Sequence, residues 1–426
     1  MHPLSEEKVF KDPVHNYIHV KDSTIWRLIN TSEFQRLRRI RQLGTSYLTF
    51  HGAEHSRFSH SLGVYEITRQ IISQFERNGY VDWPKEEKLL ALCAALLHDL
   101  GHGPFSHSME EAFDMNHEEW TRRIITGDTE VNLILGEVET GFPEKVASVI
   151  AKTYEKAIVV NLVSSPLDAD RMDYLLRDAY YTGVNYGTID MDRILRILRP
   201  YKGRVVVKES GMHAVEDYLM SRYQMYWQVY FHPVTRSSDI LLRQIFRRAK
   251  ELHQSGYEFA FMLKPLPQLF EDKITEEDYL KLDEALIQTA FMQWSEEEDA
   301  ILSDLCYRFM HRRLYKYVEV ESLDNEFIDE IKNEFERVGM NLDYDLEIDF
   351  PTDLPYDVFR PGEVSSQKQI LLLDRNDRLR EISEVSDIVR SISGIHRGKC
   401  HLYYPANKVE TVMSLLSPSV ALIFKR

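Results

Sequence analysis

The sequence is poor in cysteine and has no long apolar run. Its three cysteines, Cys93, Cys306 and Cys400, are odd in number, far apart and form no CxxC pair. This argues against a disulfide framework or a cysteine-based zinc site and favours a reducing compartment. The longest apolar run, Leu89–Leu97, is far too short to cross a bilayer, and "MHPLSEEKVF" lacks the pattern of a signal peptide. We therefore expect a cytoplasmic protein with no membrane partner.

Positive charge is also scarce. Lysine and arginine number 52 against 68 aspartates and glutamates, which gives a formal net charge of −16. Such a surface repels polyanions at long range, so nucleic acid is not an expected partner, although a local basic pocket is compatible with it. The 426 residues exceed what one hydrophobic core usually holds. We expect two or more substructures.

Hydrophobic periodicity predicts a mainly α-helical body followed by a smaller α+β lobe. Residues 1–20 read as extended, and from about residue 22 to 310 apolar residues recur at helical spacing. Within this body we expect a short strand pair near 204–210. We also expect a long helix from about Met212 to His253, bent near Pro233.

Beyond residue 315 short strand patterns alternate with helical ones. The expected strands lie within 316–322, 343–350, 368–374 and 400–405, and the expected helices within 324–339 and 381–392. We place a first domain at 1–315, with its catalytic core at about 50–235, and a C-terminal α+β lobe at 316–426.

The stretch "LLALCAALLHDLGHGPFSH" raises the main chemical question. Seven of the 16 histidines fall between His51 and His117, and His98 and Asp99 end a segment too apolar to be exposed. A buried carboxylate is costly unless something pairs with it. Because imidazole nitrogens and carboxylate oxygens are good ligands for divalent cations, the pattern predicts a metal site.

Two interpretations of this stretch compete. "HDLGH" has the histidine spacing of the HExxH zinc-protease helix. That motif needs a glutamate as general base, and Asp99 is one methylene shorter. Gly101 lies inside the motif, and Gly103 and Pro104 end the helix directly after it. The protease interpretation is therefore the weaker one.

The second interpretation uses residues from three separate segments. His60, His98 with Asp99, and Asp170 follow one another in the order H…HD…D. This order resembles the four-ligand set of the HD superfamily of metal-dependent phosphohydrolases. A bare HD dipeptide carries little information, but the whole constellation is specific.

The resemblance reaches beyond the superfamily. The segments that carry it are "FQRLRRIRQLG", "HSRFSHSLGV", "HDLGHGPFSH", "NHEEW" and "DADRMDYLLRD". Together they are similar to the deoxynucleoside triphosphate (dNTP) triphosphohydrolases, most of all to the branch containing the human sterile-alpha-motif and HD-domain dNTPase and its bacterial relatives. The similarity covers about Lys8 to Val318, and this chain has no sterile-alpha-motif domain.

Helical spacing predicts two polar walls. Asp170, Tyr174 and Asp178 recur at i, i+4 and i+8, which places them on one face of a helix. A second stretch repeats this spacing with Arg222, Tyr226 and Tyr230. Its neighbours Tyr223 and Trp227 are expected in the core.

The resemblance implies roles for individual residues. The implied metal ligands are His60, His98, Asp99 and Asp170. The implied substrate-binding residues are Gln42, Leu43, Arg57, His107, Arg171, Tyr174, Asp178, Arg222 and Tyr230. Among these, Gln42 and Asp178 would meet the sugar 3′-hydroxyl, and Leu43 would pack under the sugar. The implied catalytic residues are His117, Glu110 and His102, with His117 transferring a proton. The family usually has aspartate where Glu110 stands.

The cofactor implied is a divalent metal ion, and Mg, Mn, Fe, Zn and Ni are not distinguished, with Mg expected on the substrate phosphates. The products would be a deoxynucleoside and inorganic triphosphate.

A basic run near residue 36 has two interpretations, a solvated helix face or part of a ligand site. In the family, matching residues form a regulatory nucleotide site between the subunits of a homotetramer. The residues implied here are Lys8, Val9, Asp12, Gln35, Arg36, Arg38, Arg312, Leu314 and Lys316. Asn30 and Pro233 replace an aspartate and a lysine of the guanine-selective member, so we expect weaker guanine preference or constitutive assembly.

Two other functions remain as alternatives. One is an HD phosphohydrolase acting on another nucleotide, such as a monophosphate or a cyclic dinucleotide, which the arginines Arg57, Arg171 and Arg222 disfavour. The other is a regulatory nucleic-acid-binding protein with a vestigial metal site, which the net charge of −16 disfavours.

Overall fold

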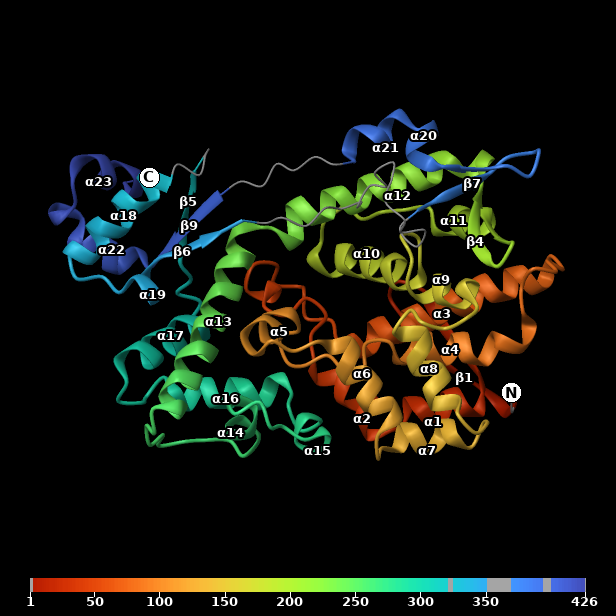
Figure 1. Cartoon of the computed structure of the whole chain (residues 1–426), viewed down its shortest axis with the longest axis horizontal. Helices are drawn as coiled ribbons and strands as arrows, with labels where there is room; N and C mark the ends of the chain where they lie inside the picture. The colour runs from red at the N-terminus through yellow and green to blue at the C-terminus, as the bar shows by residue number, and fades with distance from the viewer. Residues whose placement is uncertain (1–2, 321–324, 351–368, 394–399, 426) are drawn as a thin grey trace.

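The computed structural model describes residues 3–320, 325–350, 369–393 and 400–425. The fold is mainly α-helical, with a smaller α+β region at the C-terminal end, as predicted. Figure 1 shows helix α13 (Pro233–Gln254) running between the helical body and a lobe that contains β5, β6 and β9. In the described parts of the chain, no helix is both long enough and apolar enough to span a membrane.

The chain begins with an antiparallel hairpin, which agrees with the extended N-terminus expected from the sequence. Strand β1 (Pro3–Asp12) pairs with β2 (Asn16–Asp22), and the register runs from Pro3 opposite Asp22 to Asp12 opposite Asn16. Strand β2 packs against α1 (Ser23–Ile29) and α3 (Arg57–Arg77).

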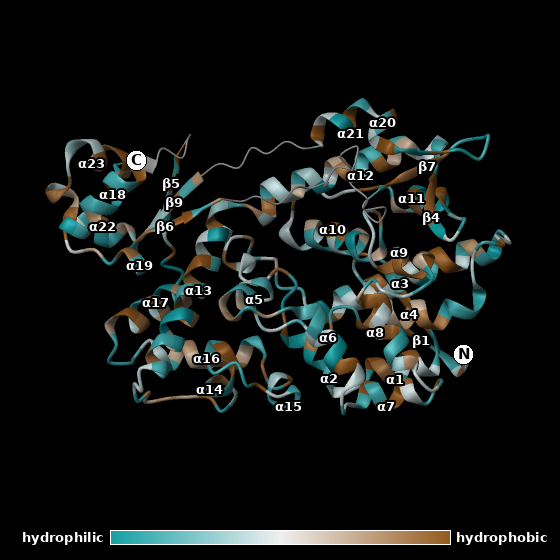
Figure 2. Ribbon diagram, in the orientation of Figure 1, coloured by the Kyte–Doolittle hydropathy of each residue, from teal (hydrophilic) through white to brown (hydrophobic). Residues whose placement is uncertain are grey.

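Helix α4 (Lys88–Leu97) lies at the centre of the helical body. It packs against α3, α8 (Phe142–Ile150) and α9 (Ala157–Val163), and every residue from Leu89 to Leu97 is buried. A helix that is apolar on all sides is stable only inside a core, and Figure 2 shows α4 in the hydrophobic colour. Helix α10 (Ala169–Thr182) packs along α3, and this pairing brings the ends of the polar segments together.

The rest of the body is built from short helices. They are α2 (Ser32–Arg36), α5 (His107–Phe113), α6 (His117–Thr126), α7 (Glu130–Gly136), α11 (Met191–Ile197), α14 (Pro265–Phe270), α15 (Glu276–Tyr279), α16 (Glu284–Trp294) and α17 (Ala300–Met310). The expected strand pair is present as β3 (Leu198–Tyr201) and β4 (Arg204–Lys208).

The expected long helix is interrupted where the sequence indicated. Helix α12 (Met212–Met225) continues into a π-helical segment, η5 (Tyr226–Tyr230), and α13 begins at Pro233. Proline lacks the amide hydrogen that an interior helical position needs, but it fits the first turn of a new helix. The expectation that Tyr223 and Trp227 are core residues was wrong, because both remain partly exposed and contact one another edge to face.

The C-terminal region is divided between two places. Strands β5 (Lys316–Val320), β6 (Glu347–Asp349) and β9 (Cys400–Tyr404) form one sheet, in the order β5-β9-β6. It is covered by α18 (Asn325–Arg337), α22 (Ala406–Val412) and α23 (Pro418–Phe424), with α19 (Leu342–Asp345) beside β6.

Another part of this region returns to the helical body. Strand β7 (Leu371–Leu373) pairs in parallel with β4 and antiparallel with β8 (Leu379–Glu381). Helices α20 (Ile382–Val385) and α21 (Asp387–Ile392) follow, and their apolar residues join the core of the body. Within the expected lobe 316–426, β7 therefore covers the open edge of β4, and α20 and α21 pack on the helical body.

Candidate active site

The four expected metal ligands meet where three helices converge. His60 comes from α3, His98 and Asp99 follow the end of α4, and Asp170 lies in the first turn of α10. Asp170 Oδ1 is 3.1 Å from His60 Nε2 and 3.6 Å from His98 Nε2. Asp99 Oδ1 is 3.3 Å from His98 Nε2. Residues 110 positions apart in sequence thus place nitrogen and oxygen atoms around one point.

Both imidazoles present their Nε2 atoms to this point. His60 Nδ1 donates to Asp173 Oδ2 at 2.8 Å, and His98 Nδ1 donates to the Ala95 carbonyl at 2.9 Å. His98 Nε2 is buried and makes no hydrogen bond within the described structure, although two carboxylate oxygens lie within 3.6 Å. Imidazole nitrogens and carboxylate oxygens converge here, and the buried His98 Nε2 has no hydrogen-bond partner in the described structure, so these residues fit a divalent metal.

The electrostatics of the cluster agree with this. Burial lowers the pKa of His60, but the carboxylates of Asp170 and Asp173 outweigh burial and raise it to about 10. Burial also opposes ionisation of Asp170, yet His60 and His98 hold the pKa of that carboxyl well below its usual range. The cluster therefore favours positive charge, which a metal ion supplies once it displaces the imidazole proton.

A second cluster lies next to the first. Glu110 Oε1 accepts from His117 Nδ1 at 2.9 Å and is 3.3 Å from His102 Nδ1. Glu110 therefore reaches His117 although the family usually has the shorter aspartate. His107 Nδ1 is 3.6 Å from Glu110 Oε2 but is largely exposed. His102 Nε2 lies 3.4 Å from Asp99 Oδ1 and so connects the two clusters.

The second cluster is suited to proton transfer rather than to holding a cation. The His102 and His117 rings stack with centroids 3.8 Å apart and planes 14° apart. A ligated cation lies close to the plane of each imidazole, and two stacked parallel planes do not share one ion. Burial, Arg57 and His117 lower the pKa of His102 to about 3, so this ring stays neutral.

Arg57 is fixed between the expected metal ligands and a strained turn. Its guanidinium pairs with Asp99 and donates to Ser106 Oγ from Nε at 3.0 Å and from Nη2 at 2.8 Å. Phe105 and Ser106 both have positive φ, at 58° and 50°. Non-glycine residues in this region are strained and concentrate at functional sites. The sequence analysis missed Ser106, since nothing in its spacing relates it to Arg57.

The two expected polar walls face one another. Asp178 Oδ2 accepts from the Tyr230 hydroxyl at 2.8 Å, and the Tyr174 and Tyr230 rings are in edge contact. Arg222 Nη2 donates to the Tyr226 hydroxyl at 3.3 Å. The helical spacing that predicted each wall is therefore realised, with the π-helical segment η5 carrying the tyrosines of the second wall.

A buried histidine that the sequence analysis missed supports Asp178. His55 Nε2 donates to Asp178 Oδ1 at 2.7 Å, and the ring stacks on Tyr181. The backbone carbonyl of His55 accepts from the backbone amide of Gln42 at 2.9 Å. The side-chain oxygen Gln42 Oε1 is buried and has no hydrogen-bond partner in the described structure. The only sequence signal for His55 was its place in the histidine-rich region. Leu43 follows Gln42 and is partly buried.

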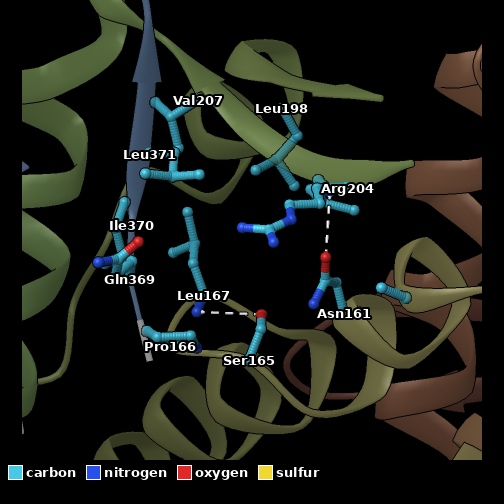
Figure 3. Close-up of a pocket in the computed structure, with 12 residues that line it drawn as sticks. Asn161, Ser165, Pro166, Leu167, Leu198, Arg204, Val207, Gln369, Ile370 and Leu371 are labelled. Atoms are coloured by element: carbon cyan, nitrogen blue, oxygen red, sulfur yellow. Dashed lines mark hydrogen bonds between the residues drawn. The ribbon is translucent and has the colours of Figure 1, made fainter. Parts of the chain in front are cut away.

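Arg171 is held at the start of α10. Its Nε donates to the Ser165 carbonyl at 2.8 Å and lies 3.3 Å from Asp168 Oδ2, while Asp168 Oδ1 caps the helix at the Arg171 amide. The preceding loop borders a separate cavity of about 100 Å³ between α9, β4 and β7. Figure 3 shows Arg204 beside Asn161 there, and no residue with an implied role lines this cavity.

The implied regulatory residues are not all on the surface. Arg36 is 1% exposed and donates to the carbonyls of Leu282 and Leu100. Asp12 is 5% exposed and pairs with Arg177. Both side chains are engaged inside the chain, so the described structure does not present them at the surface.

The other regulatory residues are accessible to different degrees. Arg38 is exposed, donates to Gln35 Oε1 at 2.8 Å and stacks on the Phe58 ring at 3.5 Å. Arg312 donates to the Leu48 carbonyl at 2.6 Å. The remaining members are exposed or partly buried: Lys8, Val9, Leu314 and Lys316.

A helical body that gathers two histidines and two aspartates between α3, α4 and α10 defines the class of the protein. The HD domain family matches residues 57–177, and the HD associated region matches residues 189–422. The chain belongs to the HD-domain family, and this membership indicates a metal-dependent hydrolase.

Relatives and solved structures agree with the family. The uncharacterized protein YwfO of Bacillus subtilis is 58% identical over 409 residues, covering 95% of this chain and 94% of that protein. The deoxynucleoside triphosphate triphosphohydrolase SAMHD1 of Gallus gallus is 28% identical over 349 residues, covering 73% of this chain and 56% of its own length.

A phosphohydrolase structure from Bacteroides thetaiotaomicron superimposes with a TM-score of 0.81 at 28% identity, covering 94% of this chain and 100% of that one. The resemblance to this branch of HD proteins is confirmed.

Proposed function

We propose that this protein hydrolyses dNTPs to a deoxynucleoside and inorganic triphosphate. The observation that carries the proposal is the 3.4 Å contact between His102 Nε2 and Asp99 Oδ1. It joins the cluster of expected metal ligands to the cluster of His102, Glu110 and His117, and the wall of α10 that carries Asp178 faces the wall of α12 and η5 that carries Tyr230. The similarity to the SAMHD1 triphosphohydrolases supports the same substrate class.

The residues that would hold the metal are His60, His98, Asp99 and Asp170. A divalent ion bound there supplies polarisation of a phosphoryl oxygen and a bound water of lowered pKa. The protein's part is to fix the ligands: Asp173 orients His60, and the Ala95 carbonyl orients His98. A second ion, Mg, would accompany the substrate phosphates.

Arginines provide the charge that a triphosphate needs. Arg57, Arg171 and Arg222 come from α3, α10 and α12, and each is held by neighbouring oxygen atoms. A preorganised guanidinium stabilises the negative charge that develops as a phosphate ester breaks. Three such groups favour a triphosphate over a nucleoside monophosphate or a cyclic dinucleotide.

His117 would protonate the leaving 5′-oxygen. Its Nδ1–H donates to Glu110, which leaves Nε2 to carry a proton toward the substrate. The carboxylate orients the ring. His102 stacks on this ring and stays neutral, so it orders the cluster without competing for the proton.

The sugar would be recognised through Asp178 and Gln42. Both oxygens of Asp178 already accept a hydrogen bond, from His55 and from Tyr230, so the carboxylate is immobilised as an acceptor. Gln42 Oε1 is a buried acceptor without a partner in the described residues. A sugar 3′-hydroxyl would satisfy these acceptors, and Leu43 would leave little room for a 2′-hydroxyl.

A nucleotide activator would act at a site between chains. Its exposed contributors would be Arg38, Arg312, Lys316 and Val9, and the partly buried members are Lys8, Gln35 and Leu314. In the family that the motifs resemble, the matching residues come from different subunits, so the site would be completed only in an assembly, which we propose is a homotetramer. The proposed location is the cytoplasm.

A panel of dNTPs and ribonucleoside triphosphates, alone and in pairs, tests the function, with released inorganic triphosphate as the readout. Each assay is repeated with His98→Ala, which lacks one expected ligand. Triphosphate release by the wild type but not by His98→Ala supports the proposal. Release of pyrophosphate, or turnover only of monophosphates or cyclic dinucleotides, contradicts it. Absence of turnover together with nucleic-acid binding would favour the regulatory alternative.

A further inference from the structure

The turn of the N-terminal hairpin reaches the side of His60 that faces away from the expected metal. His15 lies between β1 and β2, and its side chain is 6% exposed. Its Nε2 donates to Asp173 Oδ1 at 2.5 Å, a contact across 158 residues. Asp173 Oδ2 in turn accepts from His60 Nδ1 at 2.8 Å. The hairpin is thus joined to an expected metal ligand through one carboxylate.

Asp173 is a fully buried hub with no freedom to turn. Besides the two histidines, it accepts from Arg177 Nε at 2.8 Å and from Arg177 Nη2 at 3.0 Å. Each carboxylate oxygen therefore has two donors, one from an imidazole and one from the guanidinium. Because an immobile carboxylate fixes the ring it accepts from, Asp173 determines how His60 presents Nε2.

A glycine on α3 makes room for this hub. A Cβ built at Gly63 would lie 1.8 Å from Asp173 Oδ1 and 2.6 Å from Arg177 Nη2. No side chain fits at such distances, so α10 approaches α3 at that height only because residue 63 is glycine. The contact between the helices is built around the Asp173–Arg177 pair.

The turn that projects His15 is itself fixed. Asp12 Oδ1 accepts from the amides of Val14 and His15, each at 2.9 Å, and Asp12 Oδ2 accepts from Arg177 Nη1 at 2.8 Å. Strand β2 is anchored on α3, where the Tyr65 hydroxyl donates to the His19 carbonyl at 3.0 Å. The hairpin therefore docks as a rigid unit on the helix that carries His60.

We propose that the hairpin turn is part of the metal centre: His15 is a positioning residue that acts through Asp173 on His60, so that retention of the metal depends on docking of the hairpin. The inference rests on the metal centre of the proposed function and not on its substrate. The outer strand of the same hairpin carries Lys8 and Val9. A ligand that moved this strand would therefore affect the metal centre through His15 and Asp173.

The experiment compares metal retention in full-length His15→Ala, His15→Gln and His19→Ala. His19 is the matched control, because it lies on the same hairpin but its ring is half-exposed and contacts Glu7. Copurifying metal is quantified by plasma mass spectrometry, and its loss to excess chelator is followed over time. His98→Ala serves as the reference for an opened site.

We expect His15→Ala to bind its metal about tenfold more weakly than the wild type. This is the lower end of the range for residues that hydrogen-bond to a metal ligand. His15→Gln should retain it, because its amide Nε2–H reaches Asp173, and His19→Ala should match the wild type. Wild-type retention in His15→Ala overturns the inference.

If His15→Ala does not fold, His15→Asn replaces it, since its amide is too short to reach. Equal retention in His15→Asn and His15→Gln then overturns the inference. A wild type that copurifies without metal contradicts the metal centre and this inference together. Metal binding that depends on His15 in a protein without dNTP turnover supports the inference while contradicting the proposed substrate.

Discussion

His102 and His117 lie face to face, with ring centroids 3.8 Å apart and an interplanar angle of 14°. One ring contacts Asp99 of the expected metal site, and the other is held by Glu110. The pair is therefore the structural connection between metal binding and proton transfer, and the two histidines are expected to respond differently to substitution.

His117→Ala should retain metal and nucleotide but lose kcat by roughly 10²–10⁴-fold, because it removes the proton donor. Steady-state kinetics with metal analysis measure this. His213→Ala is the control, since that side chain is 86% exposed and contacts Glu216. An unchanged kcat in His117→Ala would move the role to His102.

The pH dependence of stability should reveal His102. In the folded protein burial, Arg57 and His117 lower its pKa from 6.5 to about 3. Between these values the unfolded chain binds a proton at this residue that the folded protein does not, so the stability that His102 contributes falls as the pH decreases from 6.5 to 5. His60 acts in the opposite direction, because its pKa is raised and the folded protein keeps its proton throughout this window while the unfolded chain gains it only as the pH falls towards 5.

Urea denaturation of metal-free protein at pH 6.5 and pH 5 measures this effect. His102→Gln removes the titrating group, so the difference in unfolding free energy between the two pH values should shrink. An identical difference in wild type and variant would show that His102 binds its proton equally in the folded and unfolded states, which contradicts a lowered pKa.

The contact between His55 and Asp178 predicts discrimination at the sugar 3′ position. The wild type should prefer dATP over 2′,3′-dideoxyATP by roughly 10–10²-fold in kcat/KM, the value of a hydrogen bond to a charged group. His55→Leu frees Asp178 Oδ1 and should reduce this preference, whereas His55→Gln keeps a donor and should restore it. Equal preference in all three proteins would exclude a role for His55.

Leu43 predicts discrimination at the 2′ position. A 2′-hydroxyl placed against its apolar side chain loses water without gaining a partner, so ATP should be a poor substrate compared with dATP. Leu43→Ala should reduce the difference in rate between dATP and ATP, because the smaller side chain leaves room for the 2′-hydroxyl. Equal rates on ATP and dATP in the wild type would contradict this placement of the sugar.

Arg38 tests the proposed regulatory site. Arg38→Ala removes an exposed guanidinium and should weaken stimulation of dATP hydrolysis by dGTP, if the tetramer forms as proposed. Asn30 donates its amide to the Trp26 carbonyl at 2.6 Å, which is consistent with weak guanine preference. Arg122→Ala, another exposed arginine, is the control. Strong stimulation that survives Arg38→Ala would contradict the site, and no stimulation in the wild type would indicate constitutive activity.

The sequence by itself determined the features that depend on neighbours within a few turns. The apolar run of α4 required burial, Pro233 required a helix start, and Asp170, Tyr174 and Asp178 had to share a face because α-helical geometry repeats every 3.6 residues. The resemblance of the motifs led to the family, and the structure places the four implied ligands together.

Tertiary structure decided what depends on approach between distant segments. His15 meets Asp173 across 158 residues, and His55 meets Asp178 across 123. Neither pair has a periodic signal, because contacts between elements follow from packing and not from spacing along one element. The same cause explains why Arg36 is buried although Arg38 and Arg39 are exposed, and why β7 joins the sheet of β4. Local periodicity predicts an element and its inward face, but only packing of the whole chain selects the surface that the face meets.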